Sequence, residues 1–311
     1  MYCNFFGLSE KPFDVTPDPK YLYLSLSHRE ILASLLYGIK QRQGFISIVG
    51  EVGTGKTTLL NALLDRLEPT IRTASVFNTD LTFKEILILA LLDLGVIKSS
   101  KNITKSEAIY RLNQFAISQL AGGGNVAFII DEAQNLNNRS LESLQLLSNL
   151  ETRKTKLLQI VLCGQPEMDS KLAQPRLRQL SQRISLKRCA KPLDEKETYG
   201  YINHRLSIAE YKGPPLFEDQ TLKLIWQHSG GIPRKINTLC DNALLIGFAT
   251  EKRTIEVAII KEVIRDLEWS PFANGNDSLD AIIENGIEAK VVGRKFYRWP
   301  VSTAWGFREK I

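Results

Sequence analysis

The segment 50–58 combines residue types and a spacing that suit the binding of a polyphosphate. Its glycines let the backbone curl so that successive N–H groups point into one concavity. A lysine after the last glycine supplies a cation to the β- and γ-phosphates, and the hydroxyl of the next threonine can bind Mg²⁺. The segment is a G-x-x-x-x-G-K-T motif followed by one more threonine: Gly50, Glu51, Val52, Gly53, Thr54, Gly55, Lys56, Thr57 and Thr58.

The flanking residues favour a nucleotide site over a glycine-rich turn with an incidental lysine. Residues 45–49 are a short apolar, β-branched run, which is typical of a buried parallel strand. From residue 57 to residue 64, apolar residues recur at helical spacing. The motif therefore joins a strand to a helix, and the N-terminus of that helix adds its positive dipole end to the anion site.

Two acidic residues follow another apolar strand. Residues 126–130 are uninterrupted apolar residues, and Asp131 and Glu132 come directly after them. A carboxylate at the position of Asp131 can hold the water shell of the Mg²⁺ that Thr57 binds. Glu132 is then close enough to polarise a water for attack on the γ-phosphate. Nucleotide binding needs only the aspartate, so the second acid predicts hydrolysis.

Strands and helices alternate up to about residue 190, which predicts an α/β P-loop NTPase fold with a doubly wound parallel sheet. Apolar runs predict strands at 45–49, 71–77, 126–130, 157–163 and 184–186. Helical periods predict helices at 57–64, 82–94, 104–120 and 140–151. Ser27, with Glu30 as the partner in a capping box, predicts the start of a helix that ends near residue 41.

After Pro192 the periods are helical, which predicts a small all-helical lid subdomain behind the sheet. The helices are expected at 194–209, 219–228, 233–248 and 257–267, with one short hint of a strand at 254–255. We therefore divide the chain into an arm (1–24), an α/β core (25–190), the lid (191–268), and a linker with a basic, aromatic tail (269–311). The arm is rich in aromatic residues and prolines without a helical or strand period. It is interpreted as a packed, extended cap on the core, or as a cap that also passes the nucleotide base.

Composition limits the other classes of function. The 311 residues are 43% hydrophobic and 24% charged, as in ordinary globular proteins, and the longest apolar stretch is far shorter than the ~18 residues of a membrane helix. No secretory signal is recognisable. The four cysteines have no C-x-x-C spacing, so we expect reduced, buried or half-buried thiols rather than a metal cluster or a disulfide framework. The net charge of +6 favours nucleic acid or anionic lipid only weakly.

Several stretches together resemble the AAA+ ATPases of the ExeA type, also called general secretion pathway protein A, and their relatives in exosortase and polysaccharide loci. The resemblance covers about residues 1–268. It is carried by the segments 2–8, 12–13 and 16–19 of the arm, the phosphate loop, Asp131-Glu132-Ala133-Gln134, Gly164-Gln165-Pro166-Glu167, residues 177–180 and 182–184, and Gly231-Ile232-Pro233-Arg234 to Asn237.

The resemblance implies roles for further side chains. Arg234 would be the lid arginine that reaches the γ-phosphate and reports the nucleotide state. Gln165 would orient the attacking water, although many AAA+ proteins have Asn, Ser or Thr at the strand end where this chain has Cys163-Gly164. Arg178 and Arg183, with Arg176 as a further candidate, lie where a finger would enter the site of a neighbouring subunit. For each of these three arginines, a solvated helix charge is an equal alternative.

The resemblance also implies cofactors, partners and location. We expect ATP with Mg²⁺, since no guanine-reading N-K-x-D segment is evident, and a homo-oligomer with nucleotide between subunits. Secretion-type relatives carry a membrane span and a peptidoglycan-binding domain, neither of which is recognisable here. The expected protein is therefore a cytoplasmic motor or switch of a secretion or polysaccharide-export assembly, peripheral to the inner membrane through partners. Two alternatives stay open: a DNA-binding switch of the transposition-helper type, favoured by the basic tail, and a nucleotide-binding scaffold without turnover.

Overall fold

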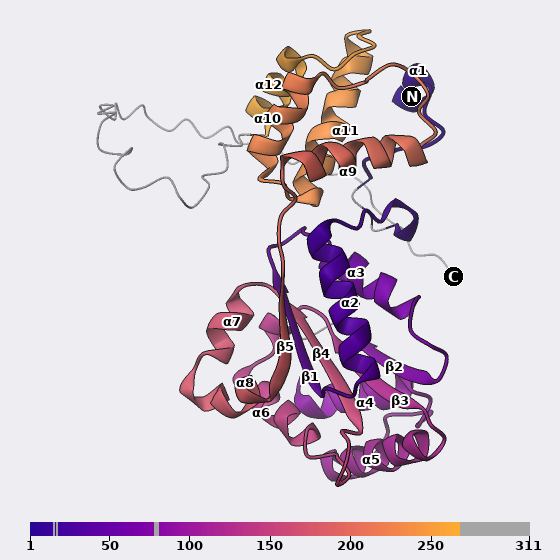
Figure 1. The fold of residues 1–311 in the computed structure, drawn as a ribbon, viewed down its shortest axis with the longest axis vertical. Coiled ribbons are helices and arrows are strands. Elements are labelled where there is room, and N and C mark those ends of the chain that lie inside the picture. The colour runs from indigo at the N-terminus through magenta and orange to yellow at the C-terminus, as the bar shows by residue number, and fades with distance from the viewer. Residues whose placement is uncertain (15, 17, 78–80, 268–311) are drawn as a thin grey trace, which may run out of the picture. The chain divides into compact units, whose positions relative to one another are not determined.

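The computed structural model describes residues 1–14, 16, 18–77 and 81–267, all of which belong to one compact unit. A parallel sheet of five strands has the order β2-β3-β4-β1-β5 (Figure 1). The strands are β1 (Phe45–Gly50), β2 (Ile71–Val76), β3 (Asn125–Ile130), β4 (Leu158–Gly164) and β5 (Ile184–Ala190). The predicted α/β class with a parallel sheet is confirmed.

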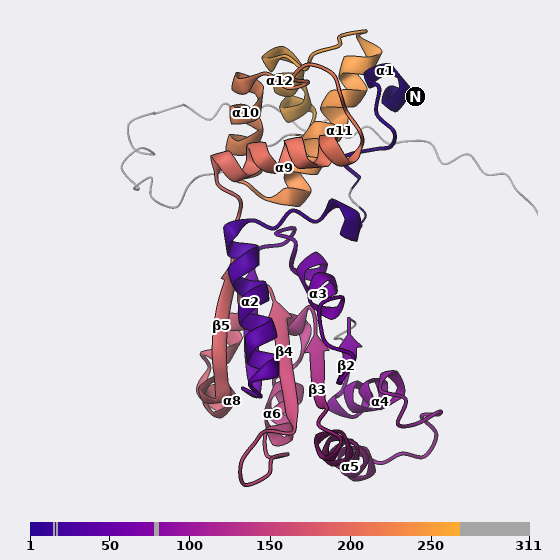
Figure 2. The ribbon, with the colours of Figure 1, turned by 45° about the vertical axis from the view of Figure 1, so that its right-hand side comes forward.

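Helices cover both faces of the sheet because its central strands are apolar on both sides. Alternate strand residues, such as Ile46 and Ile129, pack against α2 (Leu26–Lys40) and α3 (Lys56–Leu64). Their neighbours, such as Phe128, face α4 (Phe83–Asp93), α5 (Lys105–Ala121) and α6 (Asn138–Leu147). Figure 2 shows α2 running along the sheet, where it contacts β5 and β1. The phosphate loop thus lies between two buried elements, β1 and α3.

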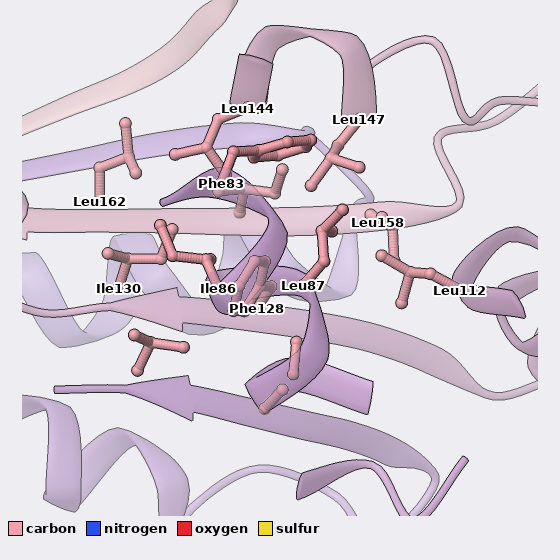
Figure 3. Packing of buried hydrophobic residues seen from close by; sticks show 14 of the residues in the cluster. Phe83, Ile86, Leu87, Leu112, Phe128, Ile130, Leu144, Leu147, Leu158 and Leu162 are labelled. Atoms are coloured by element: carbon pink, nitrogen blue, oxygen red, sulfur yellow. The ribbon is translucent and has the colours of Figure 1, made fainter. Parts of the chain in front are cut away.

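The apolar residues between the sheet and helices α4, α5 and α6 form a dense core. Ile86 and Leu87 of α4 lie toward Phe128 and Ile130 of β3, and the Phe83 ring lies toward α6 (Figure 3). Leu158 and Leu162 of β4 and Leu144 and Leu147 of α6 close the cluster from the other side. Each fully buried side chain of this size contributes about 1.5–3 kcal/mol relative to exposure. The core therefore fixes the ends of β3 and β4, where the acidic pair lies.

Four helices form the lid: α9 (Glu195–Ile208), α10 (Asp219–Ser229), α11 (Pro233–Ala249) and α12 (Val257–Asp266). Asp194 starts α9 through a reciprocal capping box with Glu197, as the D-x-x-E pattern indicates. Pro233 starts α11 at the position where its missing N–H is harmless. The hint of a strand at 254–255 corresponds to a single parallel bridge between Phe217 and Ile255.

The arm differs from the expectation of a segment without regular structure. It begins with a short helix, α1 (Tyr2–Phe6), and contains a 3-10 turn, η1 (Pro19–Tyr21). Tyr2, Phe6 and Phe13 are buried in the apolar cluster of the lid helices rather than against the sheet. Local periodicity did not reveal α1 because five residues are too few to show a period.

Other elements also differ from their predicted bounds. Ser25, not Ser27, caps α2 by accepting a hydrogen bond from the His28 N–H, while the Ser27 hydroxyl donates to the Cys189 carbonyl. Helix α6 begins at Asn138 and ends at Leu147, before the predicted end, and β5 continues to Ala190. Two short helices were not predicted, α7 (Glu167–Leu172) and α8 (Arg178–Arg183).

Two further findings concern the expectations that were drawn from the amino-acid composition. Cys189 is exposed, contrary to the expectation of buried or half-buried thiols. Among the described residues, no helix has the length and hydrophobicity needed to cross a membrane. The linker and tail expected at 269–311 lie outside the described residues.

Candidate functional site

The phosphate loop turns sharply at two glycines between β1 and α3. Gly53 has φ 82° and Gly55 has φ 91°, a left-handed conformation that side chains with a Cβ rarely adopt. Gly55 is the N-cap residue of α3, so the first N–H groups of that helix are available to an anion. A Cβ at Gly53 would approach the Arg234 Cβ to 2.7 Å, so this glycine also permits contact with the lid.

Lys56 is buried beneath the loop with its ammonium group at the loop's own carbonyls. Its Nζ donates to the carbonyl oxygens of Gly50 at 2.8 Å and Glu51 at 3.0 Å. The carbonyls of Gly50 and Glu51 therefore hold Lys56, and these two residues do not line the cavity. Residues 52–58 do line it. The lysine is held as a cation at the floor of the site.

Thr57 and Asp131 come together although 74 residues separate them. The Thr57 hydroxyl donates to Asp131 Oδ2 at 2.7 Å, and Asp131 Oδ1 accepts from the Glu132 N–H at 2.9 Å. Both side chains offer the oxygen ligands that Mg²⁺ prefers, so they fit that ion. Among the described residues, no three His, Cys, Asp or Glu side chains gather as a metal cage. A magnesium ion would therefore depend on nucleotide oxygens and water for its other ligands.

Glu132 occupies a strained position at the end of β3. Its φ is 50°, a left-handed value that costs a residue with a side chain about 1–3 kcal/mol. Glu132 Oε2 accepts hydrogen bonds from the side-chain amides of Gln134 at 2.5 Å and Gln165 at 3.0 Å. Burial is the largest single influence and raises its pKa, but the two amides and the charge of Lys56 outweigh it, so the net pKa is lowered. Glu132 is therefore a carboxylate near neutral pH.

Gln134 is a site residue that sequence reasoning did not assign, although it belongs to the Asp131-Glu132-Ala133-Gln134 stretch. Its side-chain oxygen accepts from the Gln165 N–H at 3.0 Å while its amide holds Glu132. A Cβ at Gly164 would lie 2.9 Å from that oxygen, so glycine at the end of β4 makes room for Gln134. Gln165 thus reaches the site through Glu132, and it does not line the cavity.

One cavity of about 340 Å³ lies in front of the loop. The loop, the arm, the lid and the end of β3 all contribute to its wall. Besides residues 52–58, the wall consists of Asp14, Thr16, Asp18, Tyr21, Leu22, Tyr23, His28, Glu132, Leu193, Tyr201, Arg205, Pro233, Arg234 and Asn237. Glu132 and Arg234 are thus in the same cavity as the phosphate loop, whereas Asp131 is buried and does not line it.

Arg234 joins the lid to the loop. Its backbone N–H donates to the Gly53 carbonyl at 3.3 Å, and its side chain belongs to the cavity wall. Pro233 directly before it fixes the first turn of α11. The start of α11 is therefore hydrogen-bonded to the phosphate loop.

The lid and the arm meet at a buried guanidinium that the sequence did not reveal. Arg205 of α9 donates to the backbone carbonyls of Pro12 and Asp14 and to the Tyr201 hydroxyl. Its guanidinium also stacks 4.5 Å from the centre of the Tyr21 ring. Asn237 of α11 adds a bond to the Asp14 carbonyl at 3.3 Å. About 190 residues separate Arg205 from these arm carbonyls, so no local pattern could have indicated their contact.

The three candidate finger arginines lie away from the cavity. Arg176 pairs with Glu142 at 2.8 Å, and Arg183 donates to Asn149 at 2.9 Å. Within the part of the chain that the structure describes, the exposed Arg178 side chain makes no hydrogen bond or ion pair. Only Arg178 is therefore available without breaking an existing contact.

Comparison with known proteins gives one family and one curated relative. A family model described as an AAA domain matches residues 39–172. General secretion pathway protein A of Aeromonas hydrophila is 43% identical over 249 residues, which are 80% of this chain and 45% of that protein. This chain thus spans about half the length of the curated relative that it matches.

Solved structures with the same fold have low sequence identity. The ORC2 protein of Aeropyrum pernix, in its ADPNP–ADP complexes, has a TM-score of 0.62 and 18% identity, covering 83% of this chain and 71% of that one. Drosophila ORC bound to DNA has a TM-score of 0.63 and 19% identity, covering 86% of this chain and 66% of that one. At such identities the likeness concerns the fold alone. The family model and the curated relative show that this chain belongs to the AAA+ ATPases and is a homologue of general secretion pathway protein A.

Proposed function

We propose that this chain binds ATP with Mg²⁺ in the cavity in front of the phosphate loop and hydrolyses it. The observation that carries the proposal is the meeting of three groups at one cavity. The loop presents backbone N–H groups and Lys56, and Thr57 and Asp131 supply oxygen ligands. Glu132 supplies a carboxylate beside them. Family membership supports nucleotide binding, and the arrangement of side chains supports turnover.

The triphosphate would be held by groups that are already in place. The N–H groups at the start of α3 and the helix dipole stabilise its negative charge. Lys56 leaves the carbonyls of Gly50 and Glu51 for the β- and γ-phosphate oxygens. Magnesium, when bound, neutralises part of the phosphate charge, and Thr57 and Asp131 are the residues that would hold it.

Glu132 would act as the general base for the attacking water. As the water oxygen forms a bond to the γ-phosphorus, its proton passes to the Glu132 carboxylate. The bond from the γ-phosphorus to the bridging oxygen breaks, and that oxygen leaves with ADP. Gln134 and Gln165 hold Oε2 of the base, which fixes the direction in which the carboxylate faces. Gln165 does not line the cavity, so it would orient the same water through its hydrogen bond to Glu132.

The position of the arm supports the interpretation that it runs past the nucleotide base. Tyr21, Leu22 and Tyr23 contribute to the cavity wall together with Leu193 and Tyr201 from the lid side. Aromatic and apolar surfaces of this kind suit a planar purine. The preference for ATP over GTP rests on the family.

The lid would act as the switch that reports the nucleotide. Arg234 has its backbone on the loop and its side chain in the cavity wall, so a γ-phosphate could pair with its guanidinium. Loss of that phosphate would remove the pairing and release the start of α11. Movement of the lid is the proposed output of hydrolysis.

We further propose a homo-oligomer with nucleotide between subunits, in which Arg178 is the finger. Arg176 and Arg183 are already paired within the chain, whereas Arg178 is exposed on α8. A guanidinium supplied by a neighbour could neutralise charge that develops on the γ-phosphoryl oxygens. Arg178→Ala is expected to lower kcat and leave nucleotide affinity unchanged.

The cellular context is proposed from the curated relative. Its name supports a role as motor or switch in a secretion or export assembly. The proposed location is cytoplasmic, peripheral to the inner membrane through partners. The alternative of a DNA-binding switch stays a prediction, because the basic tail that favours it lies outside the described residues. Binding of duplex DNA with a steep salt dependence would support that alternative.

Two variants test the division of roles. Lys56→Ala is expected to abolish tight ATP binding, because it removes the cation of the loop. Glu132→Gln is expected to retain binding and to lose phosphate release, because an amide cannot accept the proton. The measurements are calorimetric ATP titration and phosphate release for both variants and the wild type.

Three outcomes are informative. Equal loss of binding in both variants would contradict the roles of Lys56 and Glu132. Unchanged phosphate release from Glu132→Gln would contradict its role as the base. Binding by the wild type without any turnover would favour a nucleotide-binding scaffold.

A further inference from the structure

His28 lies against the phosphate loop and has a partner on each ring nitrogen. Its ring is buried in the first turn of α2, with 4% of the residue exposed. Nε2 is 2.8 Å from the Thr54 carbonyl oxygen, and Nδ1 is 2.8 Å from Ser25 Oγ. A Cβ at Gly55 would come within 3.4 Å of Nε2, so the ring packs directly on the loop backbone.

These contacts fix which nitrogen carries the proton. A carbonyl oxygen only accepts hydrogen bonds, so Nε2 must be the donor to Thr54. In the neutral ring Nδ1 is then an acceptor, and the Ser25 hydroxyl donates to it. Burial, the largest influence, lowers the pKa of His28 and favours this neutral form. Ser25 thus orients the ring, and it also caps α2.

The hydrogen bond to Thr54 determines the direction of the next N–H. In a planar trans peptide, the N–H points away from the side on which the C=O lies. With the Thr54 carbonyl directed at His28, the N–H of Gly55 is directed away from the ring. Gly55 belongs to the cavity wall. Its φ is 91°, and glycine has no side chain that could restrict rotation of the adjoining peptide.

The other loop carbonyls have partners of a different kind. Those of Gly50 and Glu51 accept from Lys56, and that of Gly53 accepts from the Arg234 backbone. Lys56 would leave its carbonyls when phosphate binds, so these two contacts do not persist. The contact with His28 can persist, because the ring pairs with the Thr54 carbonyl, whereas a phosphate would pair with the N–H on the opposite side of the Thr54–Gly55 peptide.

We propose that His28 is a positioning residue for phosphate binding: its Nε2–H holds the Thr54 carbonyl so that the Gly55 N–H is directed at the polyphosphate. This inference rests on the proposed nucleotide site and adds the device that preorganises it. Without the hydrogen bond the peptide can rotate, and part of the binding energy is spent on restoring it.

A series of variants at position 28 separates this role from simple packing. The amide nitrogen of glutamine is as many bonds from Cβ as Nε2 of histidine, whereas the nitrogen of asparagine is one bond nearer. His28→Gln can therefore still reach Thr54, and His28→Asn cannot, although the functional group is the same. The measurements are calorimetric Kd for ATP and for ADP, KM and kcat of phosphate release, and the unfolding temperature without nucleotide.

We expect His28→Asn to raise Kd and KM about tenfold or more, as the loss of one buried hydrogen bond implies, with kcat less affected. His28→Gln is expected to recover most of the affinity. Ser25→Ala, which leaves the ring unoriented, is expected to show a smaller loss than His28→Asn.

Equal affinities of the Gln and Asn variants would overturn the proposal, whether both bind like the wild type or both bind weakly. A shift of the unfolding temperature that parallels every loss of affinity would also overturn it, since the effect would then be structural. If the wild type binds no nucleotide, the proposed function itself fails. If the wild type binds ATP and all variants at position 28 bind it equally well, only the role of His28 is refuted.

Discussion

At the residue scale, the site depends on side chains that hold other side chains. Glu132 and Asp131 could be predicted from the sequence, because an acidic pair at the end of an apolar strand, downstream of a phosphate loop, is typical of nucleotide hydrolysis. The two amides on Glu132 could not. Their contact requires that β4 lie beside β3 and that Gly164 leave room for Gln134. Strand order is set by long-range packing, which no local pattern records.

We expect Gln134→Ala to lower kcat of phosphate release about tenfold and to change KM little. The variant removes one of the two amide donors on Oε2 of Glu132, so the base is less well directed. Gln145→Ala is the matched control, because the Gln145 side chain donates to Gln179 at the surface of α6, away from the cavity. A similar loss in both variants, or an effect confined to KM, would contradict a role for Gln134 in turnover.

The buried His28 predicts a pH dependence of stability. Its pKa is lowered from the ordinary value of 6.5, so below that pH the unfolded chain binds a proton that the folded protein binds less well. Stability contributed by the neutral ring is therefore present above about pH 6.5 and is lost as the pH falls through the folded-state pKa. Compared with His28→Gln, the wild type should lose stability more steeply as the pH falls from about 7.5 to about 5.5.

The measurement is urea unfolding of both proteins at several pH values without nucleotide. His204 and His228 are present in both chains, so their contributions cancel in the difference. Parallel curves for the two proteins would show that the His28 pKa is not lowered in the folded state.

At the element scale, long apolar runs and strong caps allowed correct predictions. Helices were predicted to begin at Thr82 and Asp194, and each of these residues caps its helix through a reciprocal capping box. Ser27 was the wrong choice for α2, because Ser25 lies three residues before the N–H of His28 and its hydroxyl reaches it. Helices α7 and α8 have six residues each, too few for a hydrophobic period to stand out.

Two glycines with nearly the same φ should respond differently to alanine. Gly231 has φ 69° and Gly95 has φ 70°, so both substitutions bring the strain of a left-handed residue, about 1–2 kcal/mol. A Cβ at Gly231 would also overlap the carbonyl of Leu193, whereas one at Gly95 would meet nothing within 4 Å. Gly231→Ala should therefore cost about 3 kcal/mol or more.

Thermal or urea unfolding of both variants checks this difference. Gly231 accepts a hydrogen bond from the Leu193 N–H just after the connection from β5 to the lid, so Gly231→Ala should weaken ATP binding as well. Equal destabilisation by the two variants would contradict the close contact at Leu193.

At the scale of the whole molecule, the cavity lies between the apolar clusters on the two faces of the sheet and a separate cluster in the lid. The lid cluster includes Tyr2, Phe6 and Phe13 of the arm. The described chain connects the sheet with the lid twice, through residues 18–25 and through residues 190–195. The sequence predicted a lid and an arm, but the arm's membership of the lid cluster depends on contacts between residues about 200 positions apart.

Phe13→Ala should destabilise the lid selectively. Phe13 is fully buried and packs edge-to-face on Phe217, with 6.1 Å between the ring centroids. Its replacement by alanine would leave a cavity and lower the free energy of unfolding by about 3–5 kcal/mol. Hydrogen exchange should accelerate in α9, α11 and α12 and remain unchanged in β1, β3 and β4. Phe77→Ala, at an exposed phenylalanine, is the control and should change neither region. Acceleration in both regions alike would mean that the lid and the sheet unfold together.

The most direct test is a crystal structure with a slowly hydrolysed ATP analogue and Mg²⁺. We predict the triphosphate against residues 52–58, the metal at Thr57 and Asp131, the base between Tyr21 and the lid, and Glu132 facing the γ-phosphate. A nucleotide bound elsewhere, or a bound triphosphate from which Asp131 and Glu132 both point away, would contradict the proposed site and its chemistry.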